Sequence, residues 1–516
     1  MSRSRSAMKN WLSMLLFTVV TMATGFIVTP LVYEPLGEDR FGLVRTLSEM
    51  FAYFGLIAQG LSVSLVPLLA KSIGVGDRDA TRRFLAAGLR CYGVVVCCIV
   101  LLGVAVLPGI PLAFPVSPAL RWELQTAWLI NIVGLPLMLA IPLKLVMDIH
   151  HRGYLASLAQ IAQSLTISSF SVFLVWRGWG VPGVMLAGVL GSLVFALIVL
   201  MINRRDYSDL LSGILQVKPA RGDIRSITSL SWPTFATMIS QRVGMLSDSV
   251  FLTLILGPAA AAVLFLNKRL STIVEGVLRS FSAATWPALV ELNARGELDL
   301  FNRRMQELTR IVMIIAIAAL VPIVCYNTAF VSLWIGPKVQ TSTAIAAVGS
   351  LNALLVTLSS IFSVPLVSTG NVKMLAVPAI IASVVNVAVS VVLIYVLGPV
   401  GPLVGTAVAL ASINLWYYPR LLQQTFGASP SKIFRACVAP LLWAFPYTAL
   451  VVLAERETVG FLPLLSRITG LFLILGLMGV CASLFVAFSV VVIFSTEERD
   501  LWKARLLTPL LQRFGR

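Results

Sequence analysis

Hydrophobic stretches follow one another along almost the whole chain, and short polar segments separate them. A helix that crosses a hydrocarbon core of about 30 Å uses about 20 apolar residues. Fourteen stretches are long enough, at residues 11–33, 41–70, 85–107, 124–148, 154–176, 181–203, 227–256, 259–288, 311–335, 344–368, 374–397, 400–419, 436–454 and 468–494. Residues 94–107 show none of the apolar and polar alternation that a membrane β-barrel requires. The pattern therefore predicts an all-α membrane protein with about 14 transmembrane helices.

The first part of the chain recurs, in weak form, 220 residues later. The shared positions include Leu36, Gly37, Pro67, Gly76, Asp79 and Arg83, which return as Leu256, Gly257, Pro287, Gly296, Asp299 and Arg303. The segment 180–183 returns as 398–401, at a spacing of 218. Six predicted helices precede the second copy, so both copies start on the same side of the membrane. This predicts two parallel six-helix lobes related by a pseudo-twofold axis, plus two C-terminal helices.

The repeat also predicts how the chain is divided. The N-lobe takes residues 1–203 with helices 1–6, and a basic joint follows at 204–226. The C-lobe takes residues 227–419 with helices 7–12, and residues 420–516 hold helices 13 and 14 and a basic cytoplasmic tail. Two lobes of this kind are typical of a transporter, with the substrate path between them.

Composition and charge agree with a membrane location. Hydrophobic residues make up 58% of the 516 residues and charged residues 12%, while the formal net charge is +17. With the N-terminus inside, 26 of the 39 Lys and Arg residues fall on cytoplasmic segments and six on external loops. This asymmetry follows the positive-inside rule, so both termini are expected in the cytoplasm and no nucleic-acid partner is needed to explain the charge.

The sequence offers little for catalysis or metal binding. All six cysteines lie within predicted spans, where they are expected to fill helix contacts. The only histidines, His150 and His151, are adjacent, and neighbouring helical residues point about 100° apart, which makes a poor metal pair. No external loop is long enough to form a domain, which disfavours a membrane-embedded glycan polymerase or acyltransferase. We expect no catalytic site, no metal and no cofactor.

Charged residues inside the spans are the strongest candidates for function, because each costs about 2.5 to 3.5 kcal/mol near the membrane centre. The seven cations are Arg45, Arg90, Lys144, Arg242, Lys268, Arg269 and Arg279, and the four acids are Glu49, Asp148, Asp248 and Glu275. On the eighth predicted helix, a stripe along one face holds Lys268, Thr272, Glu275 and Arg279, which predicts the wall of a wet cavity. Buried ion pairs that fix helix register remain the alternative interpretation.

Five segments of the sequence resemble the polysaccharide transporters of the multidrug/oligosaccharidyl-lipid/polysaccharide superfamily. They are residues 35–42 (PLGEDRFG), 60–67 (GLSVSLVP), 76–79 (GDRD), 332–337 (SLWIGP) and 384–401. The resemblance implies a flippase in the bacterial inner membrane that turns an undecaprenyl-pyrophosphate-linked oligosaccharide from the cytoplasmic to the periplasmic leaflet by alternating access. The implied partners are the lipid-linked glycan and membrane lipids, with polysaccharide-assembly proteins as a further class.

A pyrophosphate needs compensating positive charge in a low-dielectric core, and Arg and Lys supply it. The expected pyrophosphate-binding residues are Arg242, Arg279, Lys268, Arg269 and Arg45, and the expected gate or coupling residues are Glu49, Glu275 and Asp248. Glu49 and Arg269 occupy equivalent repeat positions, so we expect them to pair in a periplasmic gate.

Two other transport functions remain open. The lipid II flippase branch of the superfamily uses cations on helices 1, 2 and 8, whereas the first helix here has no charge in residues 12–32. A cation-coupled multidrug exporter would favour acidic residues in its cavity, whereas cations predominate here. A repeat-unit flippase is therefore preferred, with the lipid II flippase and the multidrug exporter as alternatives.

Overall fold

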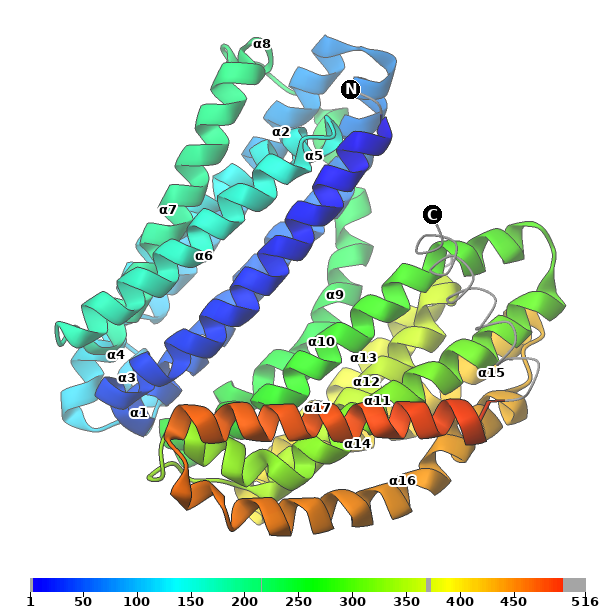
Figure 1. Ribbon diagram of the computed structural model, residues 1–516. Helices are drawn as coiled ribbons and strands as arrows, with labels where there is room; N and C mark the ends of the chain where they lie inside the picture. Colours follow the sequence, from blue (N-terminus) through cyan, green and yellow to red (C-terminus); the bar gives the residue numbers. More distant parts are fainter. Residues whose placement is uncertain (1–2, 215, 368–372, 495–516) are drawn as a thin grey trace, which may run out of the picture. The chain divides into compact units, whose positions relative to one another are not determined.

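The computed structural model describes residues 3–214, 216–367 and 373–494, and within these the side chains of 3–7, 58, 230–247, 281–284, 286, 287 and 373 lie outside the description. The described residues form helices and short connections, with no strand among them (Figure 1). The prediction of an all-α fold is thus confirmed.

The first helical element, α1 (Arg3–Val75), holds the first two predicted spans. Gly37 interrupts it with φ 74° and ψ 179°, so two helices follow one another across a break. A positive φ strains any residue with a Cβ but costs glycine little. The break therefore lies at a residue suited to it, between the predicted spans 11–33 and 41–70.

Every other predicted span coincides with a helix or with consecutive helical segments. In the first part of the chain these are α2 (Arg78–Val106), α4 (Pro118–Gly134) with α5 (Ala140–Ile149), α6 (Gly153–Trp176), α7 (Gly180–Asp206), α9 (Arg221–Leu256) and α10 (Pro258–Ala294). The later spans are α11 (Leu298–Trp334), α12 (Thr343–Val367), α13 (Lys373–Leu397), α14 (Gly401–Ala409) with α15 (Leu415–Phe426), α16 (Pro430–Val459) and α17 (Arg467–Val492).

Ten helical stretches of the described chain are long and apolar enough to cross a membrane. Two of them, Met8–Val75 and Met374–Phe426, are 68 and 53 residues long, and each contains two of the predicted spans. These ten stretches hold twelve of the predicted spans. The remaining two spans are the charge-bearing helices α9 and α10, which are not among the ten. The order of six helices, six helices and two more is therefore present.

The backbone supports the sequence repeat at three pairs of glycines. Gly37 and Gly257 both break a helix, with φ 74° and 96° and with ψ 179° and 168°. Gly76 and Gly296 have φ 77° and 73°, and one residue after each the Asp77 and Glu297 amides donate to the Ser72 and Leu292 carbonyls at 3.0 Å. Gly180 and Gly398, at the spacing of 218, have φ 54° and 58°. Equivalent sequence positions thus adopt equivalent backbone conformations.

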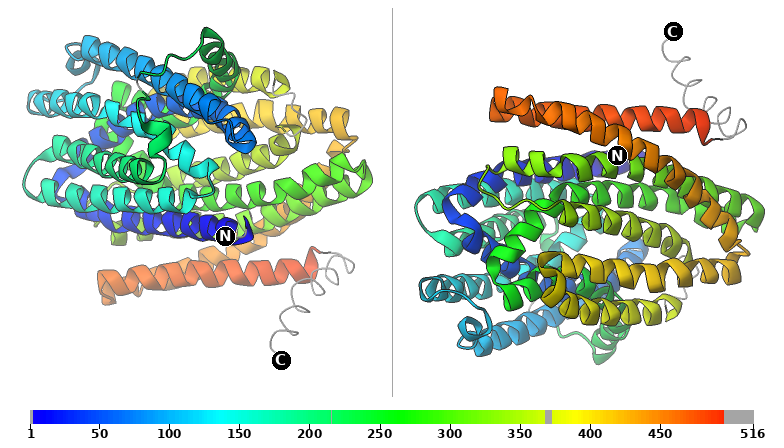
Figure 2. Two further views of the ribbon diagram at one scale, coloured as in Figure 1. Left: turned by 90° about the horizontal axis from the view of Figure 1, so that it is seen from above. Right: turned by 90° about the horizontal axis from the view of Figure 1, so that it is seen from below.

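The chain forms two compact units, residues 1–265 with 394–399 and residues 266–393 with 400–516. In the first, α1 packs against α2, α6 and α9, and α7 packs against α4 and α6, which run side by side with it in part (Figure 1). In the second, α11 packs against α12, α16 and α17 (Figure 2). The division at 203, 226 and 419 follows the sequence repeat, and it stays a prediction.

The segment between α7 and α9 is shorter than the predicted joint of 204–226. Helix α7 continues to Asp206, and a short helix, α8 (Ser208–Leu211), follows at once. Helix α9 then begins at Arg221, where the Asp223 carboxylate accepts a hydrogen bond from the Ala220 amide at 3.0 Å. An acid in the first turn stabilises the amino-terminal end of a helix, so α9 starts before the hydrophobic run does.

Candidate functional site

In the first unit, Arg45 lies against two aromatic rings. Its guanidinium carbon is 3.7 Å from the ring centre of Phe265 and 5.2 Å from that of Phe41. The two rings are 5.8 Å apart and tilted by 57°. Stacking of a guanidinium on an aromatic face is worth about 0.5 to 2 kcal/mol. Arg45 is half-buried within the predicted span 41–70, and the ring contacts help to hold its guanidinium in place.

A close approach of α1 to the start of α10 brings these groups together. A Cβ on Gly42 would lie 1.8 Å from the carbonyl oxygen of Pro258, so only glycine allows this distance. Gly42 precedes Arg45 by one turn, and Pro258 precedes Phe265 by two. The helix contact at Gly42 therefore sets the distance between the guanidinium and the ring.

A polar seam joins α1 to α9 beside Arg45. The Ser249 hydroxyl donates to Glu49 Oε1 at 2.9 Å, and the hydroxyls of Thr46 and Thr253 are 2.6 Å apart. Asp248 is 4% exposed and lies next to Ser249 in α9. Two of the predicted gate or coupling residues, Glu49 and Asp248, are therefore on facing helices of one unit.

In the second unit, α10 carries the predicted stripe of charges. The helix is continuous through Lys268, Glu275 and Arg279, so the one-face spacing holds. An Arg279 terminal nitrogen is 3.7 Å from Glu275 Oε1, and the side chains are 45% and 10% exposed. The stem of Lys268 lies against Gly349 of α12, where a Cβ would be 3.4 Å from Lys268 Cγ. The stripe thus combines one buried acid with two more accessible cations.

Two further residues were predicted to bind pyrophosphate, Arg269 and Arg242. Arg269 is half-buried on α10, and its predicted pairing with Glu49 joins different compact units and stays a prediction. Arg242 is on α9, but its side chain lies outside the described residues.

Three of the remaining charges inside the predicted spans have local structural partners. Lys144 Nζ is 2.6 Å from Asp148 Oδ2, one turn along α5. A terminal nitrogen of Arg90 donates to the Val217 carbonyl at 2.8 Å, in the segment between α7 and α9. The ion-pair interpretation therefore suits Lys144 and Asp148, while Arg90 holds backbone.

Sequence reasoning missed a buried polar centre in the second unit. Asn267 and Asn327 are both fully buried. Asn267 Oδ1 accepts from Asn327 Nδ2 at 3.2 Å and from the Ser342 amide at 2.8 Å, and its Nδ2 donates to the Gln340 carbonyl at 3.0 Å. These bonds fasten the connection between α11 and α12 to α10. An uncharged asparagine in a polar-poor span was the available signal.

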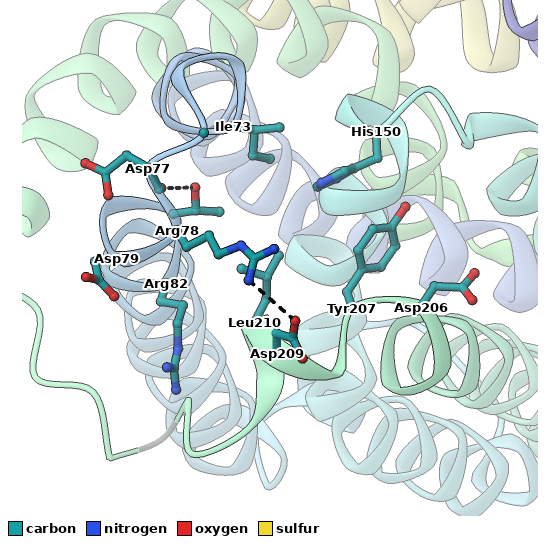
Figure 3. A pocket seen from close by; sticks show the side chains of 12 residues that line it. Ile73, Asp77, Arg78, Asp79, Arg82, His150, Asp206, Tyr207, Asp209 and Leu210 are labelled. Carbon is teal, nitrogen blue, oxygen red and sulfur yellow. Dashed lines mark hydrogen bonds and ion pairs between the residues drawn. The ribbon is translucent and has the colours of Figure 1, made fainter. Parts of the chain in front are cut away.

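A separate cavity of about 420 Å³ opens at the ends of α1, α2, α5 and α7, near the predicted cytoplasmic side (Figure 3). Arg78 and Asp209 face each other there at 3.8 Å, and Asp77 accepts the Ala80 amide at 2.9 Å as the N-cap of α2. Burial raises the pKa of the Tyr207 hydroxyl, while Arg152 opposes this shift, so the phenol stays protonated at neutral pH. None of the predicted site residues lines this cavity.

Comparison with protein families shows to which family the chain belongs. The profile of the family described as "Polysaccharide biosynthesis protein" matches residues 7–293, which is more than half of the sequence. The chain belongs to this family. The resemblance found in the sequence motifs is thereby confirmed. A search of curated proteins finds no match to this chain.

Solved structures show the same fold in membrane transporters. A multidrug resistance MATE family transporter of the MOP superfamily, in an inward-facing conformation, matches with a TM-score of 0.66 and 15% identity over 85% of this chain and 98% of its own. The lipid II flippase MurJ, in an inward closed conformation, matches with a TM-score of 0.63 and 14% identity over 87% and 99%. Identities this low show the fold alone, and this family member has the fold of these transporters.

Proposed function

We propose that this protein is a flippase for an undecaprenyl-pyrophosphate-linked oligosaccharide, the repeat unit of a polysaccharide. It moves this lipid from the cytoplasmic to the periplasmic leaflet of the bacterial inner membrane by alternating access. The family supports a role in polysaccharide biosynthesis, and the fold supports transport rather than catalysis.

The excess of cations over acids among the predicted site residues is the main support for an anionic substrate. Lys144 with Asp148, and Arg90 with the Val217 carbonyl, already have structural roles. On α1, α9 and α10, the predicted site cations with described side chains are Arg45, Lys268, Arg269 and Arg279, and the predicted acids are Glu49, Asp248 and Glu275. A substrate that carries a pyrophosphate supplies the negative charge that balances this excess.

The predicted site cations offer different kinds of contact to a pyrophosphate. Arg45 presents a planar guanidinium, whose N–H groups point along its edge and suit phosphate oxygens in pairs. Lys268 acts as a point charge, and Arg279 is accessible while it stays close to Glu275. Glu275 keeps the local charge balanced while no substrate is bound, and it competes with phosphate for Arg279.

Transport in proteoliposomes tests the proposal. The probe is a fluorescent undecaprenyl-pyrophosphate-linked oligosaccharide, and its movement between leaflets is measured by quenching from one side. Arg45→Ala and Arg279→Ala should each slow flipping at least tenfold, because a phosphate loses a charged hydrogen bond of about 1.5 to 3 kcal/mol. Arg279→Lys should recover part of the rate, since it restores charge without the planar fork.

Arg295→Ala is the matched control, because Arg295 directly follows α10 and pairs with Glu291 of that helix at 2.5 Å, and both side chains are 61% exposed. It should flip lipid at the normal rate. Normal flipping in both Arg45→Ala and Arg279→Ala would remove the pyrophosphate role from these residues.

The multidrug exporter is the second candidate, because a MATE transporter shares the fold. The same proteoliposomes can be assayed with the organic cation ethidium. Uptake of ethidium that depends on Glu49 or Glu275, together with no flipping of the lipid, would favour the exporter. A comparison of the probe with lipid II separates the two flippase alternatives.

A further inference from the structure

Phe265 is the repeat counterpart of Arg45. The spacing of 220 residues that relates Gly37 to Gly257 also relates position 45 to position 265. The first copy therefore places a cation at this position, and the second copy places an aromatic ring. The two side chains meet at 3.7 Å, so equivalent positions build one contact from two different residues.

Both side chains are accessible where their neighbours are not. Arg45 is half-buried between Val44 and Thr46, which are 4% and 1% exposed. Phe265 is half-buried between Leu264 and Leu266, which are 3% and 0% exposed. A ring that only filled the core would be buried like its neighbours. The Phe265 ring is instead only half-buried, and it covers one face of the half-buried Arg45 guanidinium.

Stacking and phosphate binding use different parts of a guanidinium. The ring contacts the flat face, while all five N–H donors lie in the plane and point outward from its edge. A stacked guanidinium has lost much of its rotational freedom before a phosphate arrives, so less entropy is lost on binding. Phe41 limits the same group from a second direction, at 5.2 Å.

We infer that Phe265 is a positioning residue, which holds the guanidinium plane of Arg45 in the orientation that binds the pyrophosphate of the lipid substrate. This inference rests on the proposed function. It adds that the affinity of Arg45 for phosphate depends on an aromatic face from the second repeat, and that a lysine at position 45 cannot use that face in the same way.

Binding of undecaprenyl pyrophosphate to the full chain in nanodiscs tests the inference, with undecaprenol as the uncharged probe. Phe265→Leu should weaken binding of undecaprenyl pyrophosphate about tenfold, within the range of a cation–π contact, and should leave undecaprenol binding unchanged. Phe265→Tyr keeps the aromatic face and should restore most of the affinity. Phe265→Met removes the ring at similar size and serves if the leucine variant folds poorly.

Phe51→Leu is the matched control, since Phe51 is an α1 aromatic that packs on Trp128 at 4.8 Å and on Phe54 at 5.4 Å. It should bind both probes normally. A double-mutant cycle then separates positioning from packing: in the Arg45→Ala background, Phe265→Leu should cause no further loss.

The outcomes distinguish this inference from the proposed function. Weak binding by Arg45→Ala together with normal binding by Phe265→Leu and Phe265→Met overturns the inference and leaves the function standing. An equal loss from Phe265→Leu with and without Arg45, or an equal loss for undecaprenol, assigns Phe265 to packing and also overturns it. Normal binding by Arg45→Ala removes the phosphate role of Arg45, and the inference falls with it.

Discussion

At the predicted periplasmic end of the first unit, the Glu123 side chain connects several segments of the chain. Its Oε1 accepts from Arg40 Nε at 2.8 Å, and its Oε2 accepts from the Val181 amide at 3.0 Å. Arg40 follows the break in α1, Glu123 lies in α4, and Val181 lies in the first turn of α7. One carboxylate thus connects three segments, and Gly180 gives it the room to do so.

Replacement of Gly180 by alanine should destabilise the protein by about 1 to 3 kcal/mol. The new Cβ would lie 2.3 Å from Glu123 Oε2, and the φ of 54° strains residues other than glycine. Thermal unfolding in detergent measures the effect as a lowered Tm. Gly188→Ala in the same helix is the control, because no atom lies within 4 Å of its Cβ position. Equal Tm values for the two variants would show that Gly180 does not constrain the carboxylate.

At the scale of single residues, the sequence predicted the charged residues better than the residues that contact them. Glu275 and Arg279 could be paired in advance, because a spacing of four on one helix brings side chains together. Phe265 and Ser249 could not be assigned to Arg45 and Glu49, since they are 220 and 200 positions away along the chain. Contacts over such separations leave no periodic signal in a single sequence.

At the scale of helices, the approach of α1 to α10 at Gly42 should tolerate no side chain. Gly42→Ala should destabilise the protein by about 1 to 3 kcal/mol, the usual cost of overpacking, because its Cβ would meet backbone that cannot rotate away. Gly55→Ala, also in α1 but with nothing within 4 Å of its Cβ position, should be neutral or stabilising. Unfolding curves of the two variants measure this difference, and a stable Gly42→Ala protein would contradict the helix contact.

The segment between α7 and α9 was predicted as a basic joint, and α2 binds it at several points. Arg82 donates to the Ser212 carbonyl, Arg90 donates to the Val217 carbonyl at 2.8 Å, and Arg83 is 4.0 Å from Asp223. Leu210, Leu211, Ile214 and Ile224 pack on a core formed by α1, α2, α5 and Ile227 of α9. The joint is thus a packed strap rather than a free linker.

Loss of the arginine contacts should open this strap to proteolysis. In the double variant Arg82→Gln and Arg90→Gln, an arginine-specific protease should cut after the exposed Arg221 several-fold faster, because two hydrogen bonds from arginine side chains to backbone carbonyls, of about 1 kcal/mol each, are lost. The rate is the disappearance of the full-length band. Arg205→Gln is the control, since the Arg205 side chain is 88% exposed. An unchanged rate in the double variant would mean that apolar packing alone holds the strap.

The hydrophobic stretches of the sequence predicted that these helices exist but not where they begin and end. The span expected at 124–148 begins six residues earlier, at Pro118, and includes a 3₁₀ turn at Leu135–Leu139. The span expected from 227 begins at Arg221, where Asp223 supports the first turn. The polar first turn of α9 extends that helix beyond the apolar run, which a hydrophobicity pattern alone does not mark.

For the molecule as a whole, the repeat carried the most information. The repeat matched glycines at three pairs of positions, and the backbone angles agree at each pair. The pattern could not reveal how tightly α9 packs on α1, because that contact depends on Thr46, Ser249 and Thr253 on two separate helices. The repeat identifies positions with equivalent backbone conformation, whereas the contact between α1 and α9 depends on side chains that differ between the two copies.

Charge asymmetry predicts the orientation of the whole chain in the membrane. With 26 Lys and Arg residues on one set of loops and six on the other, the termini and the strap should be cytoplasmic. In a background whose six native cysteines are replaced by alanine, Glu457→Cys should react with an impermeant thiol reagent in intact cells whose outer membrane has been permeabilised. Gln216→Cys in the strap should not react.

Exposure decides the choice of these positions, because Gln216 and Glu457 both have accessible side chains. A difference in labelling therefore reports the side of the membrane and not burial. Gln216→Cys should become reactive once the inner membrane is opened with detergent, which controls for reactivity of the thiol. Labelling of Gln216→Cys in cells with an intact inner membrane would invert the topology, and it would place Arg82 and Arg90, which hold the strap, on the periplasmic side against the direction of the charge bias.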